Sequence, residues 1–202
     1  MKVSRERMAE HRERILQSAA KRFRERGFEG IGVAELMQEA GLTHGGFYGH
    51  FESKDELINL ASQRALDDTV EQWQKVIASA PDEPLEALAK YYLSTRHRER
   101  PGSGCLLAAL GSDVSRQPSS LKAVVTSGLR RCLGLLEDTV AGKTEAARRQ
   151  KAIAALAGMV GGMVLARSVA DPALSREILK SVADSLSRHD RNSHDANSKA
   201  AR

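Results

Sequence analysis

The chain has 202 residues, of which 41% are hydrophobic and 28% are charged, and its formal net charge is +5. This length and composition allow a sizeable core, arranged as a small head and a larger body. Two cysteines are too few for a disulfide-stapled secreted domain. The longest apolar stretch, residues 152–166, is shorter than the roughly 20 residues of a membrane span. We therefore expect a soluble, cytoplasmic protein.

The positive charge is concentrated at the N-terminus. Residues 1–26 hold nine Lys and Arg against four Glu, which equals the excess of the whole chain. This placement suggests an anionic partner. Charge runs on helices are also often solvated faces, where Arg12, Arg22 and Arg26 could pair with neighbouring acids, and both interpretations stay open.

Apolar residues recur at helical spacing almost throughout, and no period-two strand pattern occurs, which predicts an all-α fold. In chain order the expected helices cover about residues 5–26, 33–40, 44–51, 54–79, 84–99, 105–114, 119–140, 145–169 and 173–188. Gly27 and Gly41 end the first two, and Pro84 opens the fifth. Residues 189–202 are polar and predict a disordered tail.

Residues 32–51 have the pattern of a helix-turn-helix. Gly41 supplies the residue that tolerates left-handed backbone between two short helices. Apolar residues on both helices can close over Ala19 and Phe23 of the first helix. They are Val33, Leu36, Met37, Ala40, Leu42, Phe47 and Phe51. This predicts a three-helix domain over residues 1–52, followed by a helical body over residues 53–188.

The third helix is weak by composition. Gly45, Gly46 and Gly49 together cost it about 2 to 3 kcal/mol relative to alanine, so Phe47 and Phe51 must hold it by packing. The glycines offer clearance for a close approach to DNA. Thr43 stands where an N-cap belongs.

Hydrogen-bonding side chains surround this helix. Tyr48, His50 and Lys54 suit phosphate contacts, and His44 is a candidate for reading a base. Ser53 and Glu56 have the spacing of a capping box that fixes the next helix and, with it, Lys54.

The segment from Gly41 to Lys54, GLTHGGFYGHFESK, resembles the TetR family of transcription regulators. The resemblance covers roughly the first 60 residues. It implies a homodimer that binds double-stranded operator DNA at a palindrome, usually as a repressor, and releases it when a small molecule enters the body. The DNA surface implied by the resemblance consists of Gly32, Thr43, His44, Gly45, Gly46, Tyr48, His50 and Lys54. When bound to DNA the protein would lie in the nucleoid.

The sequence departs from the family pattern at two positions. Gly32 stands where the family often has Thr, which leaves either a backbone contact or none. His44 replaces a residue that is often Lys.

Cys105 follows a Gly-Ser-Gly break at the start of an expected helix, where backbone donors favour a thiolate. The segment Gly104-Cys105-Leu106 also resembles the NemR-like branch of the family, in which a cysteine responds to electrophiles or oxidants. The alternative is a small core residue. Cys132, inside a helix, is expected to be inert.

Large side chains in the body could line an effector pocket or simply belong to the core. They are Trp73, Tyr91, Tyr92, Met159 and Met163. The small side chains of residues 152–166 allow a close helix approach, either in a four-helix dimer interface with the last helix or inside the monomer.

Two other classes of function are alternatives at this point. One is a helical interaction protein that has lost operator binding. The other is an enzyme, for which no nucleotide-loop, zinc-site or Ser/His/Asp pattern occurs, and nothing orients Cys105 with His97 as a thiol hydrolase. We expect no enzymatic activity, no cofactor and no metal.

Overall fold

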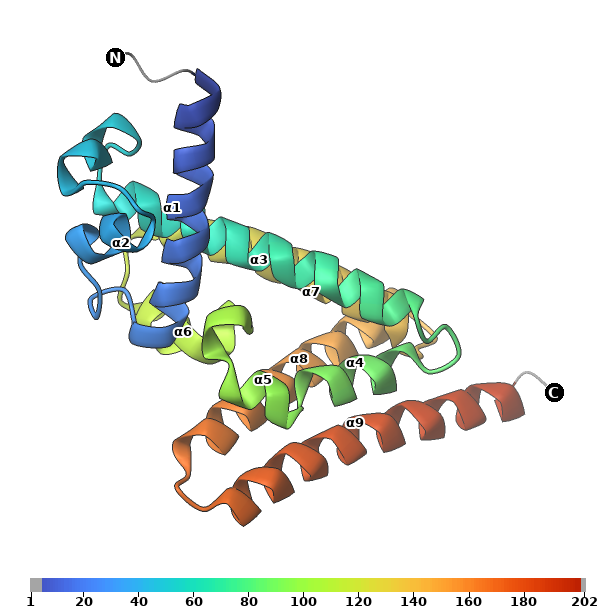
Figure 1. The fold of residues 1–202 in the computed structure, drawn as a ribbon. Helices are drawn as coiled ribbons and strands as arrows, with labels where there is room; N and C mark the ends of the chain where they lie inside the picture. The colour runs from blue at the N-terminus through green and yellow to red at the C-terminus, as the bar shows by residue number, and fades with distance from the viewer. Residues whose placement is uncertain (1–4, 201–202) are drawn as a thin grey trace. The chain divides into compact units, whose positions relative to one another are not determined.

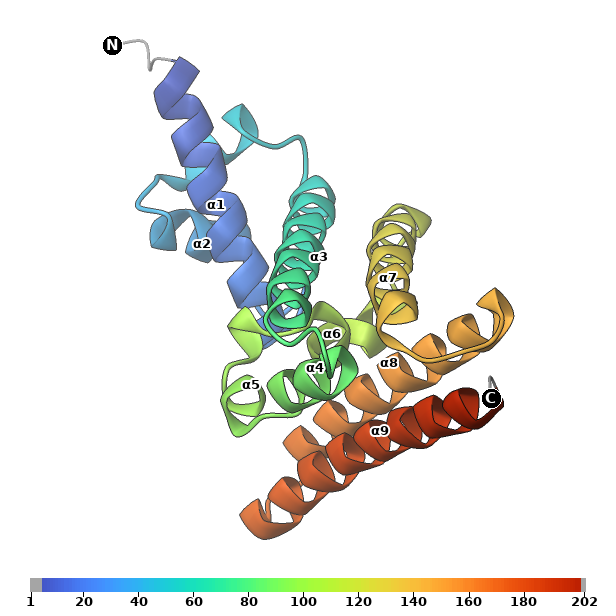
Figure 2. The same cartoon turned by 90° about the vertical axis from the view of Figure 1, so that its right-hand side faces the viewer.

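The computed structural model describes the backbone of residues 5–200 and the side chains of residues 5–188. This part of the chain is helical and has no strand, which confirms the all-α prediction (Figures 1 and 2). Its elements are α1 (Arg5–Arg26), α2 (Val33–Glu39), the 3-10 helix η1 (His44–Gly49), α3 (Lys54–Ala78), α4 (Pro84–Tyr92), α5 (Thr95–Glu99), the 3-10 helix η2 (Pro101–Ser103), α6 (Leu106–Ser115), α7 (Ser119–Thr139), α8 (Glu145–Ser168) and α9 (Pro172–Ala200).

The helices form two compact units. The first contains the chain up to Asp68 together with Pro101–Gly128, and the second contains Thr69–Arg100 together with the chain from Leu129 on. Helices α3 and α7 contribute to both units. The expected division into a domain of residues 1–52 and a body of residues 53–188 stays a prediction.

The first unit is built on one apolar stripe of α1. Ile15, Ala19 and Phe23 recur at four-residue spacing and are at most 1% exposed, because this spacing puts them on one helix face. They share a core with α2, η1, the first half of α3, α6 and the start of α7. The core members outside α1 include Leu36, Met37, Phe47, Phe51, Leu57, Ile58, Leu106, Leu110 and Leu121.

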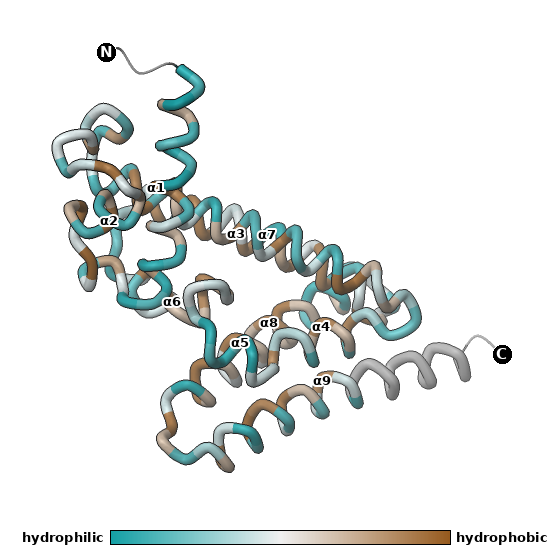
Figure 3. Tube along the Cα trace, in the orientation of Figure 1, coloured by the Kyte–Doolittle hydropathy of each residue, from teal (hydrophilic) through white to brown (hydrophobic). Residues whose placement is uncertain are grey.

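In the second unit α8 and α9 run side by side in opposite directions, and α4 packs on α9 (Figure 2). Gly162 of α8 permits this packing. A Cβ placed there would lie 3.2 Å from the side chains of both Leu93 and Val182. Small residues therefore serve packing within the chain on this face of α8. Figure 3 shows hydrophobic residues along much of α8 and hydrophilic residues over the first turns of α1.

Helix α8 is, among the described helices, long and apolar enough to cross a membrane by length and composition, with a mean hydropathy of 1.3. The same helix is a packing element of the second unit. Ala152, Met159 and Met163 on its inner face are fully buried. A buried core helix passes this test as readily as a membrane span does.

Two helices of the second unit differ from the sequence prediction. The helix expected over residues 84–99 is broken into α4 and α5, because Ser94 begins a new helix by accepting a hydrogen bond from the His97 amide at 3.2 Å. Pro84 does lie in the first turn of α4, as predicted. Helix α9 continues to Ala200, across the segment expected to be a disordered tail. The disorder expected for residues 189–202 stays a prediction, because the side chains beyond Arg188 are not described.

A glycine closes the corner after α2, as predicted. Gly41 has a φ of +70°, its amide donates to the Gln38 carbonyl at 2.9 Å, and the Leu42 amide donates to the Met37 carbonyl at 2.8 Å. These two bonds form a Schellman motif, which satisfies the last carbonyls of α2 and turns the chain toward η1.

We expect Gly41→Ala to lower the free energy of unfolding by about 1 to 2 kcal/mol, because a side chain is strained in left-handed backbone. A Cβ at this position meets only Arg14 Nη1, at 3.9 Å, so the cost comes from the backbone. Gly49→Ala is the matched control. Its Cβ meets nothing within 4 Å and its φ is not positive. Urea denaturation measures both variants, and equal effects would contradict the assignment.

Candidate nucleic-acid interface

The element expected to enter DNA is a 3-10 helix. The sequence predicted an α-helix over residues 44–51, whereas η1 covers His44–Gly49. Three glycines among six residues explain the difference, because glycine disfavours a regular α-helix and short 3-10 turns tolerate it.

Thr43 is the N-cap of η1 in extended conformation, with φ −81° and ψ 146°, but its side chain makes no capping hydrogen bond. The Thr43 backbone carbonyl accepts from the Gly46 amide at 3.0 Å instead. The predicted hydroxyl cap is therefore wrong. The Thr43 side chain is exposed and is not engaged in capping.

Two phenylalanines hold η1 in place, as predicted. Phe47 and Phe51 are 1% and 2% exposed, and their ring centroids lie 5.6 Å apart. The Phe51 amide also donates to the Phe47 carbonyl at 3.0 Å. Packing of these rings with α1 and α2 supplies the stability that the glycines remove.

The outer side of η1 carries exposed groups. Thr43, His44, Gly45, Tyr48 and Gly49 are all exposed, and the Tyr48 side chain is 74% exposed. A tyrosine has no packing reason to lie this far in solvent. The structure thus brings most of the predicted DNA-contacting residues onto one short exposed element.

The glycines of η1 are not required by the protein itself. A Cβ at Gly45 or Gly49 meets nothing within 4 Å, and a Cβ at Gly46 meets only ordinary contacts with Met37 and Thr43 at 3.7 and 3.8 Å. None of these three glycines has a positive φ. Neither internal sterics nor backbone strain accounts for them.

The remaining predicted contacts lie outside η1. Gly32 is exposed and is the N-cap of α2. Lys54 is half-buried at the start of α3, and its ammonium lies 3.3 Å from the Glu29 carboxylate. Glu29 is 85% exposed, so this ion pair is open to solvent.

One of the two bonds of the capping box predicted for α3 is confirmed. The Glu56 amide donates to Ser53 Oγ at 3.1 Å, but Glu56 Oε2 accepts from the amide of Glu52, one residue before the N-cap, at 2.6 Å. This amide bond and Arg12 hold the Glu56 pKa below its usual value.

His50 closes η1 and is half-buried. Its ring centroid lies 5.9 Å from that of His11. Burial lowers the His50 pKa below its usual value, and the positive charges of His11 and Arg12 lower it further. The neutral imidazole is thereby favoured in the folded protein.

Three arginines of α1 are paired with acids. Arg22 binds Glu39 at 2.7 Å and Glu25 at 2.9 Å, Arg26 pairs with Glu35, and Arg12 with Glu56 at 3.1 Å. These pairs favour the interpretation of the basic α1 face as an internally paired surface over that of free phosphate donors.

Arg24 does not stand out in the sequence, where it looks like any other base of a charged helix. It is 9% exposed, and its Nη1 donates to the Gly104 carbonyl at 3.0 Å. Burial lowers the Arg24 pKa, whereas Asp68, Cys105 and Glu25 act in the opposite direction. The signal that could have revealed it is position: Arg24 follows Phe23 and lies four residues after Ala20, both of which are buried.

Cys105 is the N-cap of α6, lies outside any disulfide and is 6% exposed, and its side chain makes no capping hydrogen bond. Arg24 lies close enough to interact with it electrostatically. Cys132 also lies outside any disulfide and is 3% exposed.

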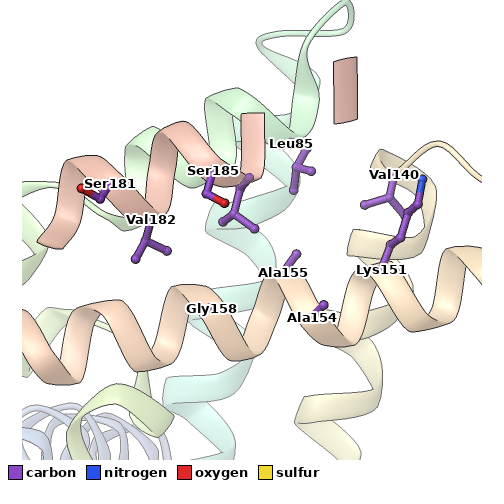
Figure 4. A pocket seen from close by; sticks show the side chains of 10 residues that line it. Leu85, Val140, Lys151, Ala154, Ala155, Gly158, Ser181, Val182 and Ser185 are labelled. Carbon is purple, nitrogen blue, oxygen red and sulfur yellow. The ribbon is translucent and has the colours of Figure 1, made fainter. Parts of the chain in front are cut away.

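The residues predicted to line an effector pocket are mostly core. Trp73, Tyr92, Met159 and Met163 are at most 2% exposed, whereas Tyr91 is 42% exposed. A cavity of about 450 Å³ lies elsewhere in the second unit, between α4, α8 and α9 (Figure 4). Its lining consists of Leu85, Val140, Lys151, Ala154, Ala155, Gly158, Ser181, Val182, Ser185 and Leu186. A role of the five predicted residues in effector binding stays a prediction.

The candidate interface lies within a segment that matches a known protein family. Residues 15–61 match the family described as "Bacterial regulatory proteins, tetR family". The repressor KstR2 of Mycolicibacterium smegmatis is 30% identical over 43% of this chain and 42% of its own length. The repressor NemR of Escherichia coli K12 is 24% identical over 64% of this chain and 66% of its own length. The chain thus spans less than two thirds of these relatives.

Solved structures share the fold over most of the chain. Reduced E. coli NemR has a TM-score of 0.72 at 23% identity and covers 87% of this chain and 94% of its own. A TetR-family regulator from Cytophaga hutchinsonii has a TM-score of 0.74 at 18% identity and covers 94% and 98%. The matched segment contains α2, η1 and the turn between them, and the helices beyond it share the fold of these structures. The chain thus resembles bacterial regulatory proteins of the TetR family, through its sequence over residues 15–61 and through its fold over most of its length.

Proposed function

We propose that this protein is a DNA-binding transcriptional regulator, acting as a repressor at a palindromic operator in the bacterial cytoplasm and nucleoid. The observation that carries the proposal is the exposed, glycine-rich η1, whose glycines have no role inside the protein. Side-chain-free positions let a backbone approach phosphates and the floor of a groove. The relatives KstR2 and NemR, both named as repressors, support the direction of regulation.

The outer face of η1 supplies the contacts in this proposal. Tyr48 reaches farthest into solvent and, with Thr43 and His50, offers hydrogen-bonding groups to phosphates, while His44 offers a ring nitrogen to a base. Lys54 contributes once its exposed partner Glu29 is displaced by a phosphate. Gly32 contributes backbone only.

Operator binding as a homodimer is supported by the surface of α8 and α9. Ile153, Val164, Leu165 and Leu174 are between 40% and 57% exposed and all lie on these two helices or at their start. Apolar side chains gathered in this way mark interaction surfaces. In the proposed dimer they form a four-helix interface with the same helices of a second copy.

A mobility-shift assay tests DNA binding directly. We expect the wild-type chain to bind the palindrome beside its own gene with an affinity that falls steeply as salt rises. Gly45→Leu is expected to bind at least about tenfold more weakly, because the new side chain fills the space reserved for DNA. Its free energy of unfolding should stay within about 0.5 kcal/mol of wild type, since nothing in the chain is displaced.

The alternative function, a helical interaction protein without operator binding, makes the opposite prediction. In that case neither the wild-type chain nor Gly45→Leu shifts the duplex, even at low salt.

Tyr48→Ala is an independent variant for the proposed DNA binding. Loss of the Tyr48 side chain should weaken binding without altering the fold.

We also propose that thiol modification of Cys105 releases the operator. Its position at the N-cap of α6, with the Arg24 guanidinium nearby, supports this proposal. Modification of a side chain with 6% exposure also requires α6 and its neighbours to rearrange, which couples the reaction to the first unit.

Cys105→Ser should keep DNA affinity within about twofold of wild type and abolish release by N-ethylmaleimide, since a hydroxyl fills the same space without the nucleophile. Cys132→Ser is the matched control and should still be released. Alkylation followed by DNA binding in the mobility-shift assay measures both. Release that persists in Cys105→Ser would overturn the sensor role.

The cavity between α4, α8 and α9 is our candidate for the small-molecule effector site. Its volume lies in the range of small-molecule pockets, and its walls are mainly alkyl side chains. Its polar groups are the hydroxyls of Ser181 and Ser185 and the ammonium of Lys151, which donates to the Ala141 carbonyl at 2.6 Å. These groups fit a small apolar molecule with an anionic end.

Decanoate and decanol provide a matched pair of probes. We expect calorimetry to show decanoate binding, and Lys151→Met to weaken decanoate by about tenfold while leaving decanol unchanged. Gly158→Leu should abolish both, because its side chain grows toward Val182 and Leu186. Gly134→Leu, whose Cβ meets nothing within 4 Å, is the control. Binding that survives Gly158→Leu would exclude this cavity.

A further inference from the structure

Arg12 of α1 joins the end of η1 to the start of α3. Its Nη1 donates to the His50 carbonyl, its Nη2 lies 3.1 Å from Glu56 Oε1, and its Cζ lies 4.4 Å from the centroid of the Phe51 ring. We call these four residues the Arg12 cluster. Arg12 contacts the last turn of η1 and the capping box of α3 at the same time.

The geometry of this cluster requires a guanidinium. A planar guanidinium donates from its edge in two directions while its face stacks on an aromatic ring. A lysine ammonium has the charge but cannot serve a carbonyl, a carboxylate and a ring face together. Arg12 therefore has a specific role that its charge alone does not explain.

The cluster acts where η1 is weakest. The 3-10 helix has no side-chain cap at its start, and His50 is its C-cap residue. Glu56 accepts from the Glu52 amide as well as from Arg12, so one carboxylate links α1, the η1–α3 connection and α3. Release of Arg12 frees the end of η1 to change its angle to α3.

Arg12 is partly exposed, at 37% of its side chain, and two of its five N–H donors reach partners within the protein, His50 and Glu56. The sequence left open whether this base pairs internally or contacts a phosphate. The two internal bonds favour a structural role over a phosphate contact.

We propose that Arg12 is a positioning residue of the DNA interface: it fixes the end of η1 against α3 and makes no phosphate contact of its own. The inference rests on the proposed function for its DNA-binding consequence. The local consequence, a fixed η1–α3 corner, is independent of DNA.

Amide hydrogen exchange of the free protein tests the local consequence. In Arg12→Met we expect exchange at His50, Phe51, Glu52 and Glu56 to accelerate by at least about tenfold, because a charge-assisted bond and a carboxylate anchor are lost. Amides of the second unit should keep their wild-type rates. Unchanged rates at the corner, or acceleration throughout the chain, would overturn the positioning role.

The salt dependence of operator binding tests the second consequence. A lost phosphate contact lowers the slope of log K against log salt by about 0.9, whereas a misplaced η1 lowers affinity without removing one specific counterion. We expect Arg12→Met to bind at least about tenfold more weakly with a slope within about 0.3 of wild type.

Arg12→Lys keeps the charge and again distinguishes a phosphate contact from the positioning role. A phosphate contact would be rescued by lysine, whereas the positioning role predicts binding close to that of Arg12→Met. Arg130→Met, which removes an exposed base of α7, controls for net charge and should bind like wild type. Rescue by lysine or a slope reduced by about one would overturn the proposal. A wild-type chain that ignores DNA would instead refute the proposed function, and hydrogen exchange would still decide the role of Arg12.

Discussion

Burial of Phe47 and Phe51 beneath η1 is the interaction on which the interface depends. A six-residue 3-10 helix with three glycines and no side-chain cap would not form by itself in water. The two rings join it to the apolar stripe of α1 and to Leu36 and Met37 of α2. The buried side of η1 thereby determines its conformation, and the exposed side is not needed to stabilise it. The Schellman turn at Gly41 sets the direction in which the chain leaves α2 toward η1.

Much of this arrangement could be predicted from sequence. Apolar spacing predicted the bounds of α1 to the residue, because Ile15, Ala19 and Phe23 recur on one face, and it placed α2 and α3 within one residue. Gly41 and the Ser53–Glu56 pair were recognisable, because few residue types fit a left-handed corner or a capping box. In these cases one local rule determined the outcome, and no distant residue opposed it.

The remainder depended on contacts that sequence spacing does not contain. Arg12 and Glu56 are 44 residues apart, and Arg24 and Gly104 are 80 apart, so neither partner could be named beforehand. Thr43 had the right type and place for a cap, but 3-10 geometry satisfies the first amides differently. Trp73 and Tyr92 had the right type for a pocket, whereas the cavity is lined by smaller residues whose significance depends on how α4, α8 and α9 meet.

The open space around the Cβ positions of Gly45 and Gly49 has an evolutionary consequence. Because a side chain at these positions meets open space and Tyr48 is 74% exposed, substitutions there are close to neutral for folding and are selected mainly by the DNA sequence that the protein binds. Gene duplicates of such a regulator can therefore diverge in target choice through single changes, with no compensating mutation in the interior.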